Sequence, residues 1–369
     1  MMAPPLTPWM TFRPAPESLA YPVGMTVEVR TPLVLADTHG RVATDLRVSL
    51  TDRCNLRCTY CMPAEGLPWL PGEEVLTDAE LHRLMTIAVE SLGITKIRFT
   101  GGEPLLRRSL EQIVADAKTL RTRAGSPPEL SLTTNGIGLD KRVSALAEAG
   151  LDRVNVSLDS LDRQRYAALA RRDRLDAVLA GLAASEAAGL LPVKVNSVIM
   201  RDVNDVDVVP LAQFCLERGY QLRFIEQMPL GPRHEWDRSK MVTQAEILKR
   251  LDERFTLRPA AEPRGAAPAE LWEVVADASQ PGGRIGVIPS VTAPFCGACD
   301  RTRITADGQM RTCLFSRTET DLRTPLRDGA SDTELAEIWA GAQARKAAAH
   351  GIGEPGFVPP VRTMSAIGG

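Results

Sequence analysis

Between residues 46 and 228 the chain alternates short apolar runs with longer segments of helical periodicity. The runs are rich in β-branched residues and fall at 46–50, 94–100, 129–135, 153–159, 193–199 and 221–227. The clearest helix is predicted from Thr77 to Gly93, because Thr77 and Glu80 match a capping box and Gly93 suits a left-handed helix end. Alternating strands and helices predict a parallel sheet with right-handed crossovers.

Six strand–helix units in succession predict an α/β fold, namely a partial, incomplete TIM-type (β/α)6 barrel. A doubly wound sheet is the competing architecture. In both architectures ligand sites form at the carboxyl ends of the parallel strands. Polar or glycine residues follow four of the predicted strands at this position: 54–61, 101–103, 135–136 and Asp159.

After about residue 240 the alternation breaks. Residues 259–283 are rich in Ala, Pro and Gly and are expected to form an irregular surface excursion. A strand at 284–290 and a hairpin around Asp307-Gly308 are predicted to follow, and the hairpin would bring Cys313 back toward Cys296 and Cys299. We therefore expect a disordered extension at residues 1–24, the partial barrel at 25–240 and a C-terminal region at 241–369.

Composition narrows the class of partner. The formal net charge is −2, which argues against binding to nucleic acid or to anionic membranes, since such proteins carry a basic excess. No run reaches the roughly 18 apolar residues of a membrane span. The Pro-rich start lacks the basic and apolar segments of a secretory signal.

Six of the seven cysteines form two sets of three. The first cysteine set is Cys54, Cys58 and Cys61, and the second cysteine set is Cys296, Cys299 and Cys313. Clustered cysteines in a long chain more often bind metal than form disulfides, which predicts a reducing, cytoplasmic compartment. Neither set has an obvious fourth ligand, whereas structural zinc is closed by four, so iron–sulfur clusters with an open position are favoured over zinc. The seventh, Cys215, is predicted to be a buried core residue.

The run CNLRCTYC at 54–61, with a strand before it and GGEP at 101–104 after the next strand, resembles the radical S-adenosylmethionine (SAM) superfamily. The resemblance implies that the first cysteine set holds a [4Fe–4S] cluster whose open iron binds SAM, which is cleaved to a 5′-deoxyadenosyl radical. It implies a SAM site made of Tyr60, Gly102, Ser157 and Met228, with Glu103 positioning SAM at the rim. From the residues alone, Tyr60 is equally well a packing aromatic and Met228 ordinary core filling.

The second cysteine set, in CGACDRTRIT with Cys313 beyond it, narrows the resemblance to the GTP 3′,8-cyclase family of molybdenum cofactor biosynthesis (the MoaA family). The match runs from about Asp45 through Phe315 and includes the terminal Gly368-Gly369. It implies a second [4Fe–4S] cluster on Cys296, Cys299 and Cys313, in a C-terminal region that binds GTP. The implied product is (8S)-3′,8-cyclo-7,8-dihydroguanosine 5′-triphosphate, formed after hydrogen is removed from ribose C3′ and C3′ bonds to guanine C8.

The same resemblance assigns residues to the substrate. Arg301 and Arg303 alternate on a strand, so both guanidinium groups project to one face and could grip an anion; without the metal site beside them they are typical of a solvated strand. Charges on inner strands are costly to bury alone, and the rival interpretation is an internal ion pair with Asp or Glu. Gly368 and Gly369 are expected to reach the active site, although a terminal glycine pair alone is typical of a flexible end. The implied GTP-binding residues are Arg47, Arg98, Thr133, Lys194, Arg301 and Arg303, with Arg223 a weaker candidate at the radical-generating site.

Two other functions stay open on the sequence. One is another radical SAM enzyme with an auxiliary cluster, such as a peptide-modifying maturase, although those usually carry further cysteines that this C-terminal part lacks. The other is a non-catalytic protein, either stabilised by zinc or an iron–sulfur electron-transfer protein. The expected cofactors are two [4Fe–4S] clusters and SAM. The expected partners are GTP and a flavodoxin- or ferredoxin-like electron donor; the resemblance also allows a homodimer.

Overall fold

The computed structural model describes residues 33–232, 236–278 and 280–368. Residues from Leu33 onward group into one compact unit. The disordered extension predicted at 1–24 and the last residue, Gly369, lie outside the described residues.

The described residues contain twelve strands and ten α-helices. The strands are β1 Asp45–Ser49, β2 Lys96–Thr100, β3 Glu129–Thr134, β4 Arg153–Ser157, β5 Lys194–Ile199, β6 Gln221–Glu226, β7 Leu257–Pro259, β8 Glu270–Val274, β9 Gly283–Ile288, β10 Arg301–Ile304, β11 Gln309–Arg311 and β12 Thr320–Asp321. The helices are α1 Asp78–Thr86, α2 Leu110–Thr119, α3 Val143–Glu148, α4 Arg163–Ala170, α5 Leu175–Ala187, α6 Val208–Glu217, α7 Gln244–Asp252, α8 Arg323–Arg327, α9 Asp332–Ala344 and α10 Met364–Ile367. None of these helices is long and apolar enough to cross a membrane.

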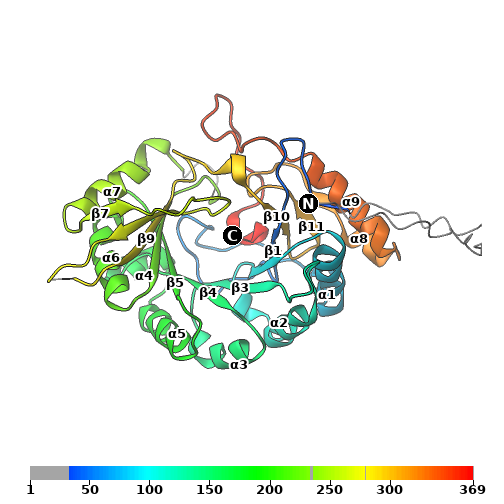
Figure 1. Cartoon of the computed structure of the whole chain (residues 1–369), viewed down its shortest axis with the longest axis horizontal. Helices are drawn as coiled ribbons and strands as arrows, with labels where there is room; N and C mark the ends of the chain where they lie inside the picture. The colour runs from blue at the N-terminus through cyan, green and yellow to red at the C-terminus, as the bar shows by residue number, and fades with distance from the viewer. Residues whose placement is uncertain (1–32, 233–235, 279, 369) are drawn as a thin grey trace, which may run out of the picture. The chain divides into compact units, whose positions relative to one another are not determined.

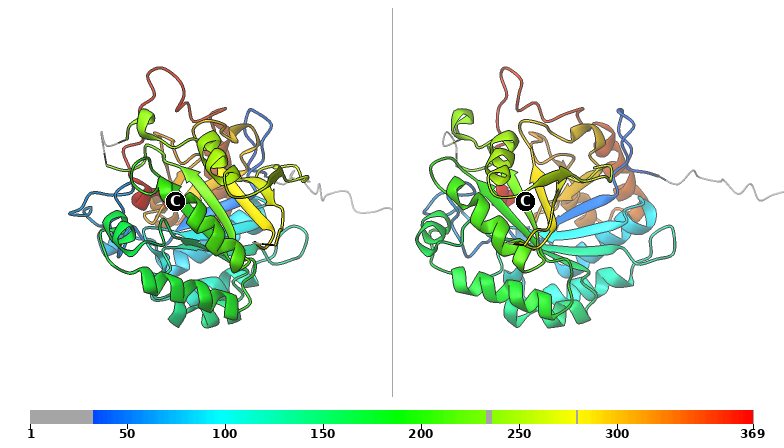
Figure 2. Two further views of the ribbon diagram at one scale, coloured as in Figure 1. Left: turned by 90° about the vertical axis from the view of Figure 1, so that its left-hand side faces the viewer. Right: turned by 60° about the vertical axis from the view of Figure 1, so that its left-hand side comes forward.

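All twelve strands belong to one sheet, in the order β12-β11-β10-β1-β2-β3-β4-β5-β6-β9-β8-β7. The eight strands from β10 to β9 pair in parallel, and the strands outside them pair antiparallel. Strands β1 to β6 follow one another without a reversal, which rules out the doubly wound alternative. The sheet curves around an interior, with helices α1 to α6 on its outer side (Figure 1, Figure 2).

The two faces of the parallel strands differ sharply in chemistry. Leu46 and Val48 of β1 and Phe99 of β2 are fully buried on the outer face, within the main hydrophobic core that includes the helices. The alternate positions form the inner face, where Arg47 pairs with Arg98 in the register of β1 and β2. The interior of a closed TIM barrel is filled by bulky branched side chains. Here polar and charged side chains take the place of that apolar filling, and a cavity lies on the inner face.

Helix α1 begins where the sequence predicts. The Thr77 side chain accepts from the Glu80 backbone N–H, and the Glu80 side chain accepts in return from that of Thr77. The helix ends in a wider turn than predicted, a π-helical segment at Ile87–Ser91 whose first three residues are buried. Gly93 then takes φ +84°, as expected of a helix end.

The C-terminal region completes the sheet at both sides. Strand β10 pairs in parallel with β1, and β9 pairs in parallel with β6. The predicted hairpin is confirmed: β10 and β11 pair antiparallel around Gly308, which has φ +77°.

The irregular excursion predicted at 259–283 is wrong in part. Strand β8 lies within it and pairs antiparallel with β9. The five residues of β8, ELWEV, lie between Ala- and Pro-rich flanks that are not typical of a strand. Their hydrogen bonds to β9 are non-local, so local composition does not predict them.

Candidate active site

Both cysteine sets line one cavity of about 310 Å³ on the inner side of the sheet. The first set lies in the loop that follows β1, and the second lies on both sides of the β10–β11 hairpin. None of the six thiols is in a disulfide. A volume of this order is typical of a small-molecule site. The hairpin predicted from the sequence thus brings Cys313 to the same cavity as Cys296 and Cys299, because all three line it.

Close backbone packing fixes the loop that carries the first cysteine set. The backbone N–H of Gly102 donates to the Thr51 carbonyl at 2.7 Å, and that of Glu103 donates to the Arg53 carbonyl at 2.8 Å. A Cβ on Gly101 would lie 2.4 Å from the Thr51 oxygen, and one on Gly102 would lie 2.3 Å from the Arg53 oxygen. Only glycine permits this approach, so both glycines brace the cysteine loop as well as lining the cavity.

Glu103 has a different place from the one expected at the rim beside SAM. It is fully buried and does not line the cavity. Its carboxylate accepts from the Thr134 hydroxyl at 2.7 Å and from the backbone N–H groups of Leu105 and Asn135 at 2.9 and 2.7 Å. Burial raises the pKa of Glu103 to about 7, against these hydrogen bonds. Glu103 thus ties β2 to the end of β3 and supports the site from behind.

The second cysteine set is braced by two segments far from it in sequence, at Arg41 and at 346–348. The Lys346 ammonium donates to the Cys299 sulfur at 3.3 Å. The Arg41 guanidinium donates to the Cys296 carbonyl at 2.7 Å and to the Ala348 carbonyl at 2.8 Å. Burial alone would raise the pKa of Cys299, but the charges of Lys346 and Arg301 hold it below its usual value.

The donor atoms of both sets fit iron–sulfur clusters. Among the described residues, no three His, Cys, Asp or Glu side chains converge as closely as a single metal ion requires. A four-iron cluster is wider than one ion, so its thiols do not have to meet at a point. The donors are thiols alone, the ligands that iron–sulfur clusters take. Burial raises the pKa of Cys61 to about 12, and the neighbouring Ser365 acts in the opposite direction.

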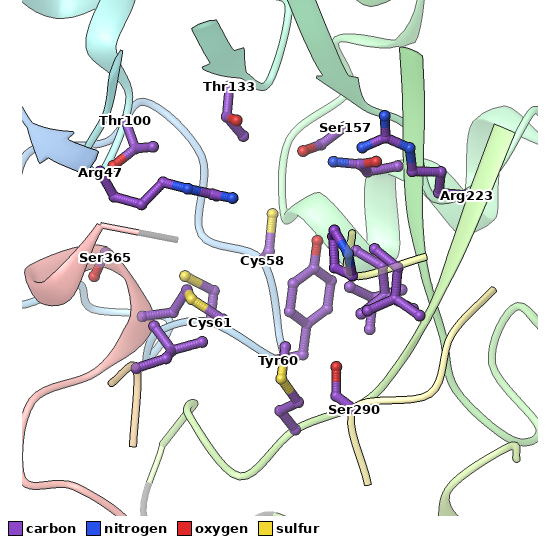
Figure 3. A pocket seen from close by; sticks show the side chains of 18 of the residues that line it. Arg47, Cys58, Tyr60, Cys61, Thr100, Thr133, Ser157, Arg223, Ser290 and Ser365 are labelled. Atoms are coloured by element: carbon purple, nitrogen blue, oxygen red, sulfur yellow. The ribbon is translucent and has the colours of Figure 1, made fainter. Parts of the chain in front are cut away.

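The four residues predicted for SAM all line this cavity: Tyr60, Gly102, Ser157 and Met228. Figure 3 shows Tyr60 and Ser157 among the side chains around it. The Tyr60 hydroxyl donates to Asp159 at 2.8 Å, and the other oxygen of Asp159 accepts from the Val198 backbone N–H at 2.9 Å. Tyr60 is thereby held in place by the carboxylate that follows β4. Met228 also packs against a smaller apolar cluster around Phe315, so its core-filling role is present as well.

Of the six residues predicted for GTP, five line the cavity and Lys194 does not. Arg98 donates to the Ser131 hydroxyl at 3.1 Å and forms no ion pair within the part of the chain that the structure describes. Arg47 donates to Asp45 at 3.1 and 3.3 Å. The rival prediction of an internal ion pair therefore holds for Arg47, although its side chain also faces the cavity (Figure 3). Lys194 starts β5 on the same inner face.

Positive charge on the inner face exceeds what its carboxylates neutralise. Although burial would raise the pKa of Asp45, the charges of Arg47, Arg98 and Arg301 hold it well below its usual value. Burial and the mutual repulsion of the cations lower the remaining pKa values, that of Arg223 to about 10, that of Arg303 to about 9 and that of Lys194 to about 7. Buried, repelling cations without matching anions are typical of a site for an anionic ligand.

Two of these arginines keep donors unused. The Nε atoms of Arg301 and Arg303 are buried and have no hydrogen-bond partner in the described structure. Arg301 lies over the Phe295 ring at 4.4 Å from its centroid and donates to the Ala266 carbonyl. Unpaired buried donors are costly unless a ligand satisfies them.

The C-terminal tail enters the interior, as expected for Gly368 (Figure 1). The Gly368 carbonyl accepts from Arg303 at 3.1 Å. Three residues earlier, Ser365 contacts the Cys61 sulfur, and Figure 3 shows the two side chains near each other. Arg362 anchors the tail through two hydrogen bonds to Asp307, at 2.9 and 2.7 Å. The tail therefore connects the β10–β11 hairpin to the first cysteine set.

Several cavity residues were missed by the sequence reasoning. Asn196 lies two positions after Lys194 on the inner face of β5, so strand alternation could have found it. Ser365 and His350 line the cavity from segments with no periodic signal. Lys346 and Arg41, which support the second set from outside the lining, have no local signal either, because only the tertiary fold brings them there.

Two family models match most of the chain between them. One described as the radical SAM superfamily matches residues 48–215, and one described as molybdenum cofactor synthesis C matches residues 220–352. Proteins named GTP 3′,8-cyclase are similar along nearly all of the chain. The one from Corynebacterium glutamicum is 65% identical over 338 residues, covering 91% of this chain and 89% of the relative. The one from Mycobacterium marinum is 62% identical over 335 residues, covering 91% and 92%.

A solved structure supports the fold independently. The crystal structure of Streptococcus suis SuiB bound to S-adenosylmethionine aligns with a TM-score of 0.55 at 13% identity, covering 82% of this chain and 65% of that one. At this identity the likeness shows a shared fold alone.

Proposed function

This chain belongs to the GTP 3′,8-cyclase family of radical SAM enzymes, and we propose that it converts GTP to (8S)-3′,8-cyclo-7,8-dihydroguanosine 5′-triphosphate, the first step of molybdenum cofactor biosynthesis. The observation that carries the proposal is the shared cavity, where two thiol sets and an excess of arginines surround one space. A nucleoside triphosphate supplies the negative charge that this space lacks.

The arginines are proposed to hold the triphosphate and to fix its orientation. Three neighbouring strands carry four of them: Arg301 and Arg303 lie on β10, Arg47 on β1 and Arg98 on β2. Arg223 lies on β6, farther along the sheet. Guanidinium groups bind phosphate oxygens bidentately, and the free Nε atoms of Arg301 and Arg303 leave donors for this purpose. The ribose is thereby held at a fixed place in the cavity, which supplies the positioning that a reaction between C3′ and C8 requires.

The first cysteine set is proposed to hold one [4Fe–4S] cluster and the second set another. When bound, the clusters and SAM would supply the one-electron chemistry of radical generation and an iron site for the guanine. Tyr60, Ser157, Gly102 and Met228 are proposed to line the SAM site. Met228, Phe295, Leu314 and Phe315 give the cavity apolar walls that exclude water from the reacting atoms.

The tail is proposed to complete the site around the substrate. Gly368 lies against Ser49 and Thr100 at the carboxyl ends of β1 and β2 and binds Arg303 through its carbonyl. We propose the same role, completing the site around the substrate, for Gly369.

The finer architecture follows from this proposal. We assign residues 25–240 to an incomplete (β/α)6 barrel for SAM and residues 241–369 to the part that carries the second cluster and most of the GTP contacts. The chemistry requires a one-electron donor, for which a flavodoxin- or ferredoxin-like protein is suited. Two oxygen-sensitive clusters suit a reducing cytoplasm. The family resemblance also allows a homodimer.

The proposal is tested with anaerobically purified protein, reconstituted with iron and sulfide, in the presence of SAM, dithionite and GTP. Mass spectrometry follows deoxyadenosine and the cyclised nucleotide. Arg301→Ala and Arg303→Ala are expected to form deoxyadenosine but to lose the cyclised product, whereas Arg258→Ala, an exposed control on β7, keeps both. A wild-type product yield in either cavity variant contradicts the assignment. Deoxyadenosine with unchanged GTP in the parent protein supports another radical SAM enzyme instead, and no deoxyadenosine from cluster-loaded protein supports electron transfer.

A further inference from the structure

Lys346 is buried in an unusual environment. Only 3% of its surface is exposed, in the segment that follows α9. Lysine is almost never fully buried unless it is paired, yet Lys346 forms no ion pair with any carboxylate of the described residues.

The three donors of its ammonium group are all used around the second cysteine set. They reach the Arg301 carbonyl at 2.8 Å, the Cys299 carbonyl at 3.1 Å and the Cys299 sulfur at 3.3 Å. An ammonium group has three donors and no acceptor, so this shell is complete. The carbonyls offer partial charges only. The Cys299 sulfur is the one group of the three that can carry a full negative charge.

The charge balance at this site depends on what the sulfur binds. A buried ammonium without an anion is costly, and a metal-bound thiolate offsets that cost. Reduction of an iron–sulfur cluster adds one more negative charge beside the same ammonium. The positive charge therefore stabilises the reduced form more than the oxidised form, and hydrogen bonds to ligand sulfurs act in the same direction.

We propose that Lys346 is a positioning residue of the second cluster, which raises the reduction potential of that cluster and orients Cys299 and Arg301 toward the cavity. This inference rests on the proposed function, because it needs the second cluster. It goes further by linking the cluster to substrate binding: the lysine that contacts the cluster ligand also holds the backbone of Arg301, whose guanidinium lies in the cavity.

The test measures a potential and does not depend on turnover. In full-length protein with Cys54, Cys58 and Cys61 changed to Ala, only the second cluster remains, and its midpoint potential is read by redox titration with electron paramagnetic resonance. Lys346→Gln removes the charge but keeps an amide donor for one carbonyl. We expect the midpoint potential of this variant to be lower by at least about 59 mV, which corresponds to a tenfold change in the one-electron equilibrium constant. Lys346→Arg is expected to restore most of the potential.

Two controls isolate the effect. Lys249→Gln removes an exposed lysine from α7 and is expected to leave the potential unchanged. In protein with Cys296, Cys299 and Cys313 changed to Ala, Lys346→Gln is expected to leave the first cluster unaffected. An equal shift of the first cluster would contradict a local role.

The remaining outcomes also decide. An iron-loaded Lys346→Gln protein with the parent potential overturns the inference and leaves the proposed function intact. If Lys346→Gln does not assemble the cluster, the Lys346→Arg variant decides between two roles. Assembly of the cluster at the parent potential supports a charge-dependent role. Failure to assemble the cluster means that the lysine acts through packing, which overturns the inference. A parent protein that holds no second cluster overturns the two-cluster function itself.

Discussion

The substitution Gly368→Ala tests whether the docked tail is needed for cyclisation. Gly368 has φ +87°, and a Cβ there would lie 2.6 Å from the Thr100 hydroxyl oxygen and 2.8 Å from the Ser49 Cβ. A left-handed conformation costs a non-glycine residue about 1–2 kcal/mol, and overpacking costs about 1–3 kcal/mol. The sum is about 2–5 kcal/mol against the docked tail.

Because Gly368 belongs to no strand of the sheet and is held through the Arg303 contact to its carbonyl, the strain is relieved by undocking the tail and not by unfolding the barrel. Even about 2 kcal/mol lowers the ratio of docked to undocked tail roughly 30-fold. The docked fraction, and with it the cyclised product, is expected to fall by up to that factor, while the melting temperature and the iron content stay at wild-type values. The assay follows product and deoxyadenosine by mass spectrometry under saturating GTP.

Two glycines of the same C-terminal segment serve as controls. Gly356 has φ +83° but no atom within 4 Å of its Cβ position, so Gly356→Ala tests the backbone term alone. Gly353 has no strained φ, and the nearest atom to its Cβ position is 4.0 Å away. Both variants are expected to keep near-normal product yield. If Gly368→Ala matches Gly353→Ala, the docked tail is not required and the reasoning is refuted.

Three further predictions concern the tail anchor, the cationic interior and the first cysteine loop. Arg362→Gln removes the two hydrogen bonds to Asp307 and is expected to lower product yield with little change in melting temperature; an unchanged yield means that the tail docks without the anchor. Lys194 has a folded-state pKa lowered to about 7, chiefly by burial and the charge of Arg223, so the unfolded chain binds more protons between pH 7 and 10.5. Stability from this group therefore rises with pH across that window, and denaturant unfolding of Lys194→Met is expected to lack the rise; an identical pH profile contradicts the pKa assignment. Gly102→Ala forces a Cβ to 2.3 Å from the Arg53 oxygen and is expected to reduce iron bound by the first set, whereas Gly297→Ala, with open space around its Cβ position, keeps the iron of the second; equal iron content in both variants refutes the close-packing argument.

The strands and the rim could be predicted from the sequence because both depend on local patterns. All six runs between 46 and 227 became strands, and the thiol-rich and glycine-rich segments after β1 and β2 lie at the cavity. The prediction that Cys215 is a core residue is confirmed, since it is 1% exposed. Motif spacing also found the six thiols of the cavity, because Cys54, Cys58 and Cys61 lie close in sequence, as do Cys296 and Cys299, and the predicted hairpin connects these two to Cys313.

The remainder of the site depends on contacts between distant segments. Arg41 and Lys346 reach the second cysteine set from 255 and 47 residues away. Glu103 lies buried behind the site and not at the predicted rim, because two of its hydrogen-bond donors, Thr134 and Asn135, are brought to it only by the fold. The partners of Arg47 and Arg98 differ although both face inward, since Asp45 lies beside one and Ser131 beside the other. Strand alternation could have found Asp45, two positions before Arg47, whereas Ser131 lies on a different strand from Arg98.

The central claim is that this one cavity brings the ribose of GTP to the radical chemistry of the first cysteine set. The most direct test supplies cluster-loaded protein with SAM, dithionite and GTP that carries deuterium at C3′, and measures the mass of the deoxyadenosine formed. We expect deuterium to move from C3′ into deoxyadenosine as the cyclised nucleotide appears. Deoxyadenosine that remains unlabelled while GTP is recovered unchanged would contradict it.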